Sequence, residues 1–138
     1  MLSISSKSTY GLQALLTLGE NYGEGLLQVR EIAAINAIPL QFLVQIFNLL
    51  VKAETIRSVR GKNGGYTLAR PPSAITVLEI FEILEGGLEF SAKQHGLPGA
   101  VDELFGIAEA KLREVFGITL ADLLARQQQL NRILTYDI

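Results

Sequence analysis

Hydrophobic residues recur every three or four positions along most of this chain, the period of an amphipathic α-helix. The pattern predicts helices over 10–22, 29–37, 39–53, 77–85, 101–116 and 120–130. Between the third and fourth helices, 55–59 and 66–68 are rich in β-branched and aromatic residues, which favour strands. The expected fold is therefore mostly α with a small β-hairpin.

Capping residues mark where several of these helices begin and end. Ser8 is a candidate N-cap for the first helix, and Pro39 suits the first helical position of the third. Thr76 and Glu79 have the spacing of a capping box, and Gly86 ends the helix that they begin. Thr119 is a candidate cap for the last helix.

The third helix carries its polar residues along one narrow strip. The strip consists of Gln41, Gln45, Asn48 and Lys52, whose spacing sends all four side chains in one direction. Amides both donate and accept hydrogen bonds, as reading base edges in a DNA major groove requires. The same residues also suit an ordinary neutral surface, so the strip alone leaves both interpretations open.

The predicted hairpin that follows is basic. Gly61, Gly64 and Gly65 supply the positive-φ positions of a tight loop. The basic residues on or beside the hairpin are Arg57, Arg60, Lys62 and Arg70, with no acidic residue between Thr55 and Arg70. An arginine-bearing arm can enter a minor groove, which favours DNA binding over a solvated turn.

The helix over 29–37 and the connection around 36–39 predict a helix-turn-helix, in which the first helix braces the second against the DNA backbone. Gln28, at the start of the first helix, is a candidate phosphate contact. With the hairpin, these elements form a winged helix-turn-helix.

The charge distribution agrees with this interpretation although the net charge is −2. Residues 1–70 contain seven basic and four acidic side chains, a balance of +3, and residues 71–138 have a balance of −5. Because phosphate is neutralised by the local field, the acidic second half does not exclude DNA binding.

Composition excludes several other classes of protein. The chain has no cysteine, which excludes disulfides, thiolate catalysis and conventional cysteine-ligated iron–sulfur clusters. The absence of a long apolar run and of a signal peptide predicts a cytoplasmic protein that does not enter membranes. His95 is the only histidine, and in a glycine-rich loop such a residue is more often solvated than a metal ligand. No metal site and no enzyme active site are predicted.

The helix over 101–116 has an apolar stripe, and so short a chain has few other elements for the stripe to pack against. We therefore expect a second copy of the chain to cover it. The predicted dimerisation residues are Val101, Leu104, Phe105, Ala108, Leu112, Val115 and Phe116. An internal core helix is the alternative. The apolar tail over 131–138 is expected to dock on the partner or on the body of the same chain.

Three stretches, SSKSTYG, PLQFLVQIFNLL and SVRGKNGGYTLAR, resemble the Rrf2 family of winged helix-turn-helix regulators. The resemblance implies base contacts by Gln41 and Gln45, minor-groove contact by Arg60 with Gly61, and phosphate contacts by Lys7 and Tyr10. Val44 stands where one branch of the family has glutamate, which implies that this chain recognises a different DNA sequence from that branch. The resemblance also identifies 101–116 as the dimerisation helix and 86–100 as the counterpart of a loop that carries three cysteines in cluster-binding members.

Together these features divide the chain into a DNA-binding domain over 1–85, a loop over 86–100 and a dimerisation and C-terminal helical part over 101–138. The expected function is a homodimeric, sequence-specific transcriptional regulator, with repressor as the expected type, acting on a palindromic operator of double-stranded DNA and controlled by an unidentified effector or protein partner. The alternative is a winged-helix protein-interaction module. Steep salt dependence would favour DNA over a mainly apolar partner.

Overall fold

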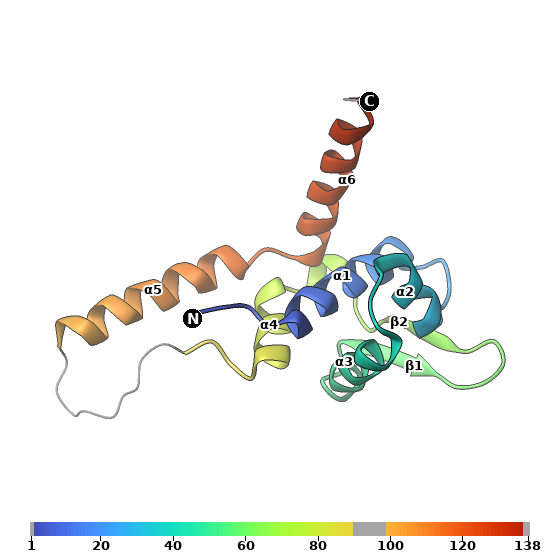
Figure 1. The fold of residues 1–138 in the computed structure, drawn as a ribbon, viewed down its shortest axis with the longest axis horizontal. Helices are drawn as coiled ribbons and strands as arrows, with labels where there is room; N and C mark the ends of the chain where they lie inside the picture. Colours follow the sequence, from blue (N-terminus) through green and yellow to red (C-terminus); the bar gives the residue numbers. More distant parts are fainter. Residues whose placement is uncertain (1, 90–98, 137–138) are drawn as a thin grey trace.

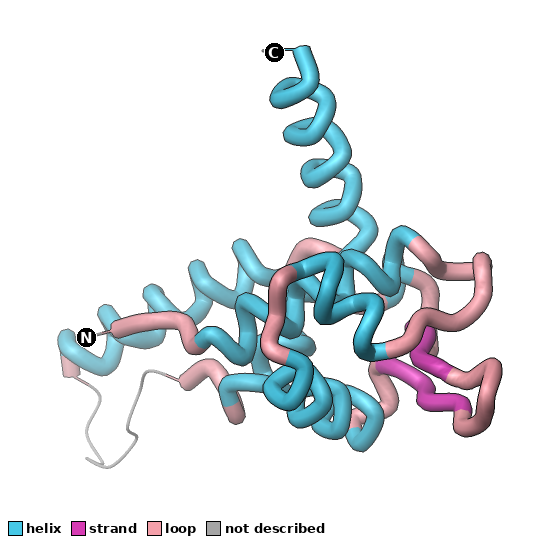
Figure 2. The backbone as a smooth tube through the Cα atoms, turned by 45° about the vertical axis from the view of Figure 1, so that its right-hand side comes forward, coloured by secondary structure: helices cyan, strands magenta, loops and turns pink. Residues whose placement is uncertain are grey.

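The computed structural model describes residues 2–89 and 99–136 of the chain. Its elements are α1 (Ser6–Glu20), α2 (Val29–Asn36), α3 (Leu40–Lys52), β1 (Ile56–Val59), β2 (Gly65–Leu68), the 3₁₀ helix η1 (Pro72–Ala74), α4 (Val77–Glu85), α5 (Ala100–Phe116) and α6 (Leu120–Tyr136). Helices α1 to α4 and the hairpin form the body (Figure 1). Helices α5 and α6 extend from it in two different directions (Figure 2). The predicted fold, mostly α with a β-hairpin wing, is confirmed.

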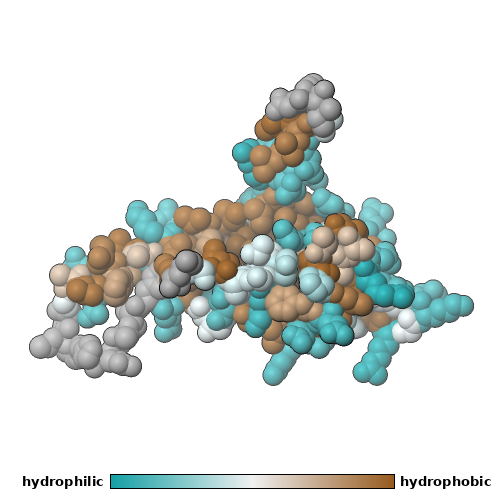
Figure 3. Space-filling view, viewed as in Figure 1, coloured by the Kyte–Doolittle hydropathy of each residue, from teal (hydrophilic) through white to brown (hydrophobic). Residues whose placement is uncertain are grey.

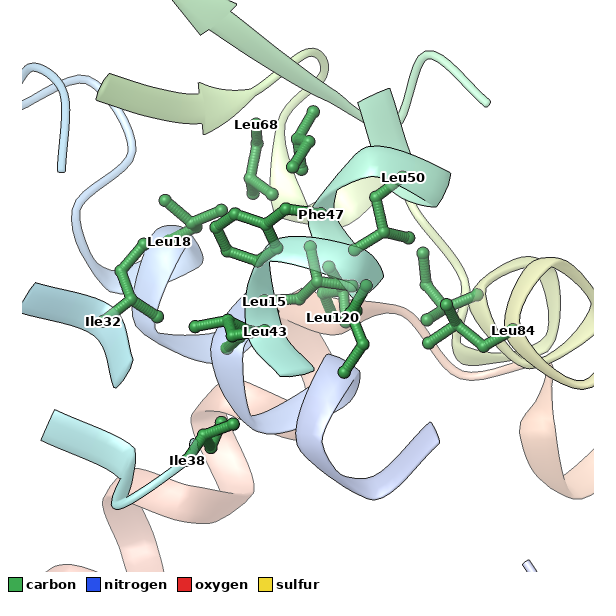
Figure 4. Packing of buried hydrophobic residues seen from close by; sticks show 14 of the residues in the cluster. Leu15, Leu18, Ile32, Ile38, Leu43, Phe47, Leu50, Leu68, Leu84 and Leu120 are labelled. Carbon is green, nitrogen blue, oxygen red and sulfur yellow. The ribbon is translucent and has the colours of Figure 1, made fainter. Parts of the chain in front are cut away.

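The core lies between α1 and α3, and these two helices supply most of its fully buried side chains. Leu15 of α1 and Phe47 of α3 are both 0% exposed. Figure 4 shows them facing each other, with Ile32 of α2 on one side and Leu120 of α6 nearby. The ring of Phe47 also meets the ring of Tyr66 in the hairpin, with centroids 4.8 Å apart. The core therefore fixes α3 relative to the wing.

Helices α2 and α3 form the predicted helix-turn-helix. Their axes differ in direction by 120°, and only three residues connect them. Ala37 takes the left-handed conformation at φ 52° and ends α2, and Ile38 is buried beneath the turn. Pro39 is the N-cap residue of α3, one position before the first helical position predicted for it. No single helix within 2–89 or 99–136 is long and apolar enough to span a membrane, although α2 and α3 pass that test when taken together.

The wing is an antiparallel hairpin in which Ile56 pairs with Leu68 and Val59 with Gly65. Gly61 and Gly65 have positive φ, at 115° and 156°, as the glycine-rich tip predicted, whereas Gly64 does not. The backbones of Leu27 and Tyr66 exchange hydrogen bonds of 2.7 and 3.1 Å, which ties the wing to the segment before α2. A side chain at Gly65 would meet the Leu27 carbonyl oxygen at 2.6 Å, so this contact requires glycine.

Ser8 does not cap α1, which corrects the sequence interpretation. The helix begins at Ser6 with Ser5 as its N-cap, and Ser8 is a fully buried helical residue. Its hydroxyl donates a hydrogen bond of 2.6 Å to Oε1 of Glu85, at the end of α4. The hydroxyl and the backbone N–H of Ser5 donate to the same oxygen, at 2.5 and 3.1 Å. These bonds join the start of α1 to the end of α4.

Because the hydroxyls of Ser5 and Ser8 donate to its carboxylate, the pKa of Glu85 lies below its usual value of 4.5. A depressed folded-state pKa contributes stability above the unfolded pKa, and this contribution is lost as the pH falls through the folded value. We expect Glu85→Gln to lower the melting temperature at pH 7 and the difference from the unmodified protein to shrink below about pH 4.5. Thermal melts across pH 3 to 7 test this, with Glu89→Gln as the control. A difference independent of pH would contradict it.

Helix α4 has the predicted capping box. Glu79 N–H donates to the Thr76 hydroxyl, and Thr76 N–H donates to the Glu79 carboxylate. Gly86 ends the helix at φ 83°. Thr119 and Asp122 form the same reciprocal pair at the start of α6, which confirms Thr119 as its cap.

The C-terminal region differs from the prediction in one respect. Helix α6 continues to Tyr136 instead of ending near Gln129, so the predicted tail is helical over most of its length. Ile133 and Leu134 on this helix are 51% and 64% exposed, so they do not dock on the body of the chain. Within the loop over 86–100, residues 90–98, including His95, lie outside the described part of the chain.

Candidate nucleic-acid interface

The polar strip of α3 faces solvent along its whole length. All of its members are exposed, namely Gln41, Gln45, Asn48 and Lys52. The opposite side of the helix is buried through Leu43, Ile46, Phe47 and Leu50. We call the four exposed residues the recognition strip. It presents three amides and one ammonium group on a helix whose orientation is fixed by the core.

The wing places positive charge beside α3. Arg57, Arg60 and Lys62 are all exposed. Neither of the two ion pairs among the described residues involves them. Figure 3 shows hydrophilic side chains projecting from the side of the molecule that carries α3 and the wing, at its lower right. This surface combines hydrogen-bonding groups with cations that are available to phosphate.

Arg70 has a different role from the other basic residues of the predicted hairpin. Its guanidinium forms an ion pair of 2.8 Å with Glu79 and donates a hydrogen bond of 2.8 Å to the Ala74 carbonyl oxygen. Arg70 therefore ties the end of the wing to the capping box of α4. The sequence placed Arg70 beside the hairpin, and the structure adds the partners of its guanidinium.

The predicted contacts outside α3 and the wing lie in α1 and at the start of α2. The ring of Tyr10 meets the ring of Phe42 edge-on, with centroids 5.6 Å apart. Gln28 is the N-cap residue of α2, and its side-chain oxygen accepts a hydrogen bond of 3.0 Å from Arg30. Lys7 is half-buried in the first turn of α1. The exposed Arg30 was not among the predicted contacts, although it follows Gln28 closely and shares its element.

A second surface lies on α5, where large apolar side chains are open to solvent. Val101, Leu104 and Val115 are each more than 60% exposed. Ile107, which the sequence analysis did not include, is 52% exposed. Phe105 is exposed and Ala108 is half-buried. The apolar stripe therefore remains largely uncovered within one chain.

Two of the predicted dimerisation residues also face the body of their own chain. The ring of Phe116 stacks on that of Phe81 in α4, with centroids 4.8 Å apart, and Leu112 lines a pocket with these two residues. Arg113 reinforces this junction by donating hydrogen bonds to Glu82 at 2.6 Å and to the Leu88 carbonyl oxygen at 3.1 Å. The C-terminal end of α5 is thus fixed to α4, and its N-terminal part projects away.

A family model identifies the chain. The model for Rrf2, described as an iron-dependent transcriptional regulator, matches residues 4–126, which include every element from α1 to the first turns of α6. The chain belongs to the Rrf2 family. The resemblance that the sequence motifs indicated is confirmed, and the protein is a DNA-binding transcriptional regulator by family.

Individual Rrf2 proteins show the same relationship. The chain is 38% identical over 85 residues to CymR of Bacillus subtilis, a match that spans 62% of each chain. The structure of that protein, the global cysteine regulator, superposes with a TM-score of 0.82 at 34% identity, covering 91% of this chain and 98% of the other. The IscR structure from T. potens gives a TM-score of 0.80 at 35% identity, covering 94% and 90%. These relatives are regulators, in agreement with the prediction that the chain is not an enzyme.

The iron dependence named for the Rrf2 family raises the question of a metal or cluster in this member. A cysteine-ligated iron–sulfur cluster does not fit, because the chain has no cysteine to supply thiolate ligands. Within the described residues, no group of three or more His, Asp or Glu side chains is placed to hold a metal ion. The chain itself therefore supplies no cysteine ligand for the iron that the family description names.

Proposed function

We propose that this Rrf2 protein is a homodimeric, sequence-specific transcriptional regulator that places α3 in the major groove and the tip of the wing in the adjacent minor groove. The observation that carries the proposal is the recognition strip, an amide-rich surface on a rigid helix beside three exposed cations. Glutamine and asparagine suit adenine edges, and arginine suits a narrow minor groove.

Within this interface, the predicted residues divide into three roles. Gln41 and Gln45, in the first half of α3, read bases, because the N-terminal part of a recognition helix meets base edges. Arg60 with Gly61 enters the minor groove. The remaining predicted residues position the protein on phosphates, namely Lys7, Tyr10, Gln28, Asn48, Lys52, Arg57 and Lys62.

The exposed stripe on α5 supports a two-fold dimer. A stripe of apolar side chains that is open in the isolated chain is best covered by the same stripe of a second copy. Next to it, an apolar groove between α1, α4 and α6 is lined by residues that include Leu12, Phe81, Phe116 and Leu123. Two copies related by a two-fold axis would read half-sites about 34–36 Å apart, or a multiple of that distance. Because the two copies are identical, the operator is a palindrome. The relatives named above come from bacteria, in which operator DNA lies in the cytoplasm. The proposed place of action of this protein is therefore the cytoplasm.

Selection of bound sequences from a random DNA pool tests the proposal as a whole. The expected product is an imperfect palindrome with half-sites one or more helical turns apart. Recovery of sequences without any preferred motif would contradict sequence-specific binding. A single, non-repeated motif would contradict the dimer and leave the recognition strip supported.

Replacing Gln45 by alanine tests the base-reading role of the recognition strip. We expect Gln45→Ala to weaken binding to the selected operator about 5- to 150-fold per half-site, because a bidentate base contact contributes about 1–3 kcal/mol. Binding to random DNA should change little, since phosphate contacts supply most of it. Fluorescence anisotropy with both DNAs measures the two effects. Gln128→Ala, on exposed α6, is the matched control, and equal losses on operator and random DNA would show that Gln45 does not read bases.

A further inference from the structure

An apolar side chain stands at the leading end of the recognition helix. Leu40 is the first residue of α3 and is 41% exposed, although the turn residue two positions before it, Ile38, is buried. Val44, one turn later on the same side, is half-buried. The polar Gln41 and Gln45 lie next to this pair along the helix. The proposed DNA-reading face is therefore not purely polar, because its first turn has an aliphatic edge.

The position of Leu40 places it where bases are read. In a helix-turn-helix, the N-terminal residues of the second helix contact base edges. Side chains in a helix tilt toward its N-terminus, so Leu40 projects beyond the start of α3, ahead of Gln41. Of the groups that base pairs present in the major groove, the C5-methyl of thymine is the apolar one. An exposed leucine at this end can make an apolar contact with that methyl group, whereas it cannot hydrogen-bond to the polar groups of a base edge.

We propose that Leu40, with Val44 beside it, contacts the C5-methyl of a thymine in each half-site and so specifies thymine there. This inference rests on the proposed DNA-binding function and adds a specificity element to it. The amides of Gln41 and Gln45 read the hydrogen-bonding edges of neighbouring base pairs. Leu40 and Val44 thus read the thymine methyl group, which the hydrogen-bonding amides do not recognise.

A second exposed leucine on the same helix provides an internal comparison. Leu49 is 38% exposed, close to the value for Leu40. It lies nine residues later, which is two and a half turns, so it points to the opposite side of α3. It also lies in the C-terminal half of α3, one turn beyond Gln45, whereas Leu40 lies in the first turn, where bases are read. Leu49 therefore shares the chemistry of Leu40 but not its proposed contact.

Deoxyuridine substitution tests the proposal without altering the protein. Deoxyuridine differs from thymidine only by the absence of the C5-methyl, so pairing and shape are retained. Each thymine of the selected operator is replaced in turn, and affinity is measured by anisotropy. At one thymine position we expect about a fourfold loss per half-site, the factor for losing one buried methyl-sized group. Substitution in both half-sites should give about a fifteenfold loss.

Variants at Leu40 then assign the effect. With Leu40→Ala the unmodified operator should bind more weakly, and the loss on deoxyuridine substitution should disappear. Leu40→Met, which keeps an apolar side chain, and Leu49→Ala should both retain that loss. Circular dichroism melts establish that each variant is folded.

The outcomes separate this inference from the function on which it rests. Failure to select any preferred sequence would overturn the proposed function. An operator in which no thymine methyl affects affinity would overturn only the role of Leu40. A methyl effect that persists in full in folded Leu40→Ala would likewise assign the contact to another residue.

Discussion

Leu104→Glu is expected to convert the protein to a monomer and to weaken operator binding about a hundredfold. Leu104 is 61% exposed on the apolar stripe of α5. In a two-fold interface the substitution places two carboxylates in an apolar contact, where unpaired charges are costly. Loss of the dimer removes the second DNA-binding unit, and linked binding of two units raises affinity by about 10² to 10⁴. Sedimentation and anisotropy measure both effects.

Ala110→Glu is the matched control for this prediction. Ala110 is also exposed on α5, and the substitution adds the same charge to the same helix. It lies six residues from Leu104 and therefore on the other side of α5 from the apolar stripe. The control should remain dimeric and keep its affinity. A Leu104→Glu protein that stays dimeric with full affinity would show that α5 is not the interface.

Phe47→Ala is expected to reduce the free energy of unfolding by about 3–5 kcal/mol. Phe47 is fully buried, and its ring packs between the α1 core and Tyr66 of the wing. Truncation leaves a cavity at the place where the recognition helix, the core and the hairpin meet. Since small domains have total stabilities of about 5–15 kcal/mol, this single change removes a large part of the stability. Urea denaturation followed by circular dichroism measures it.

Leu49→Ala is the control for Phe47→Ala, because it truncates an apolar side chain of the same helix that is not buried. Leu49 is 38% exposed, so its truncation removes little buried surface. We expect a loss well below that of Phe47→Ala, about 1 kcal/mol or less. Similar losses for the two variants would mean that Phe47 does not have the central packing role that the structure gives it.

Local patterns in the sequence predicted the winged helix-turn-helix well, because its parts are specified by neighbouring residues. The apolar and polar sides of α3 follow from a 3.6-residue period, and the wing tip follows from glycines at positions that need positive φ. The reciprocal hydrogen bonds of Thr76 and Glu79 were predictable for the same reason, since the two residues are three positions apart. The chemistry of the recognition strip was also predictable, and its role in DNA reading stays a prediction.

Contacts between residues far apart in the sequence were not predictable. Ser8 looked like a helix cap because its hydroxyl suits one, but its actual partner, Glu85, is 77 positions away. The ion pair of Arg70 was not predicted, because its partner Glu79 belongs to the next element. Phe116 looked like part of the dimer stripe alone, and only the packing of α5 on α4 shows that it also contacts Phe81. Periodicity shows that a side chain is apolar but does not show what it packs against.

In the proposed dimer, the junction between α5 and α4 also bears on how far apart the two DNA-binding parts can lie. The ring stack of Phe81 and Phe116 and the clamp by Arg113 hold one end of a 17-residue rod, while the other end is free of the body. A rod of that length is about 25 Å long, so a tilt of about 10° at the clamp displaces its far end by about 4 Å. A displacement of that size exceeds the rise of one base pair. In the proposed dimer, the contacts of Phe81, Phe116 and Arg113 would therefore influence which operator spacings the two copies can reach.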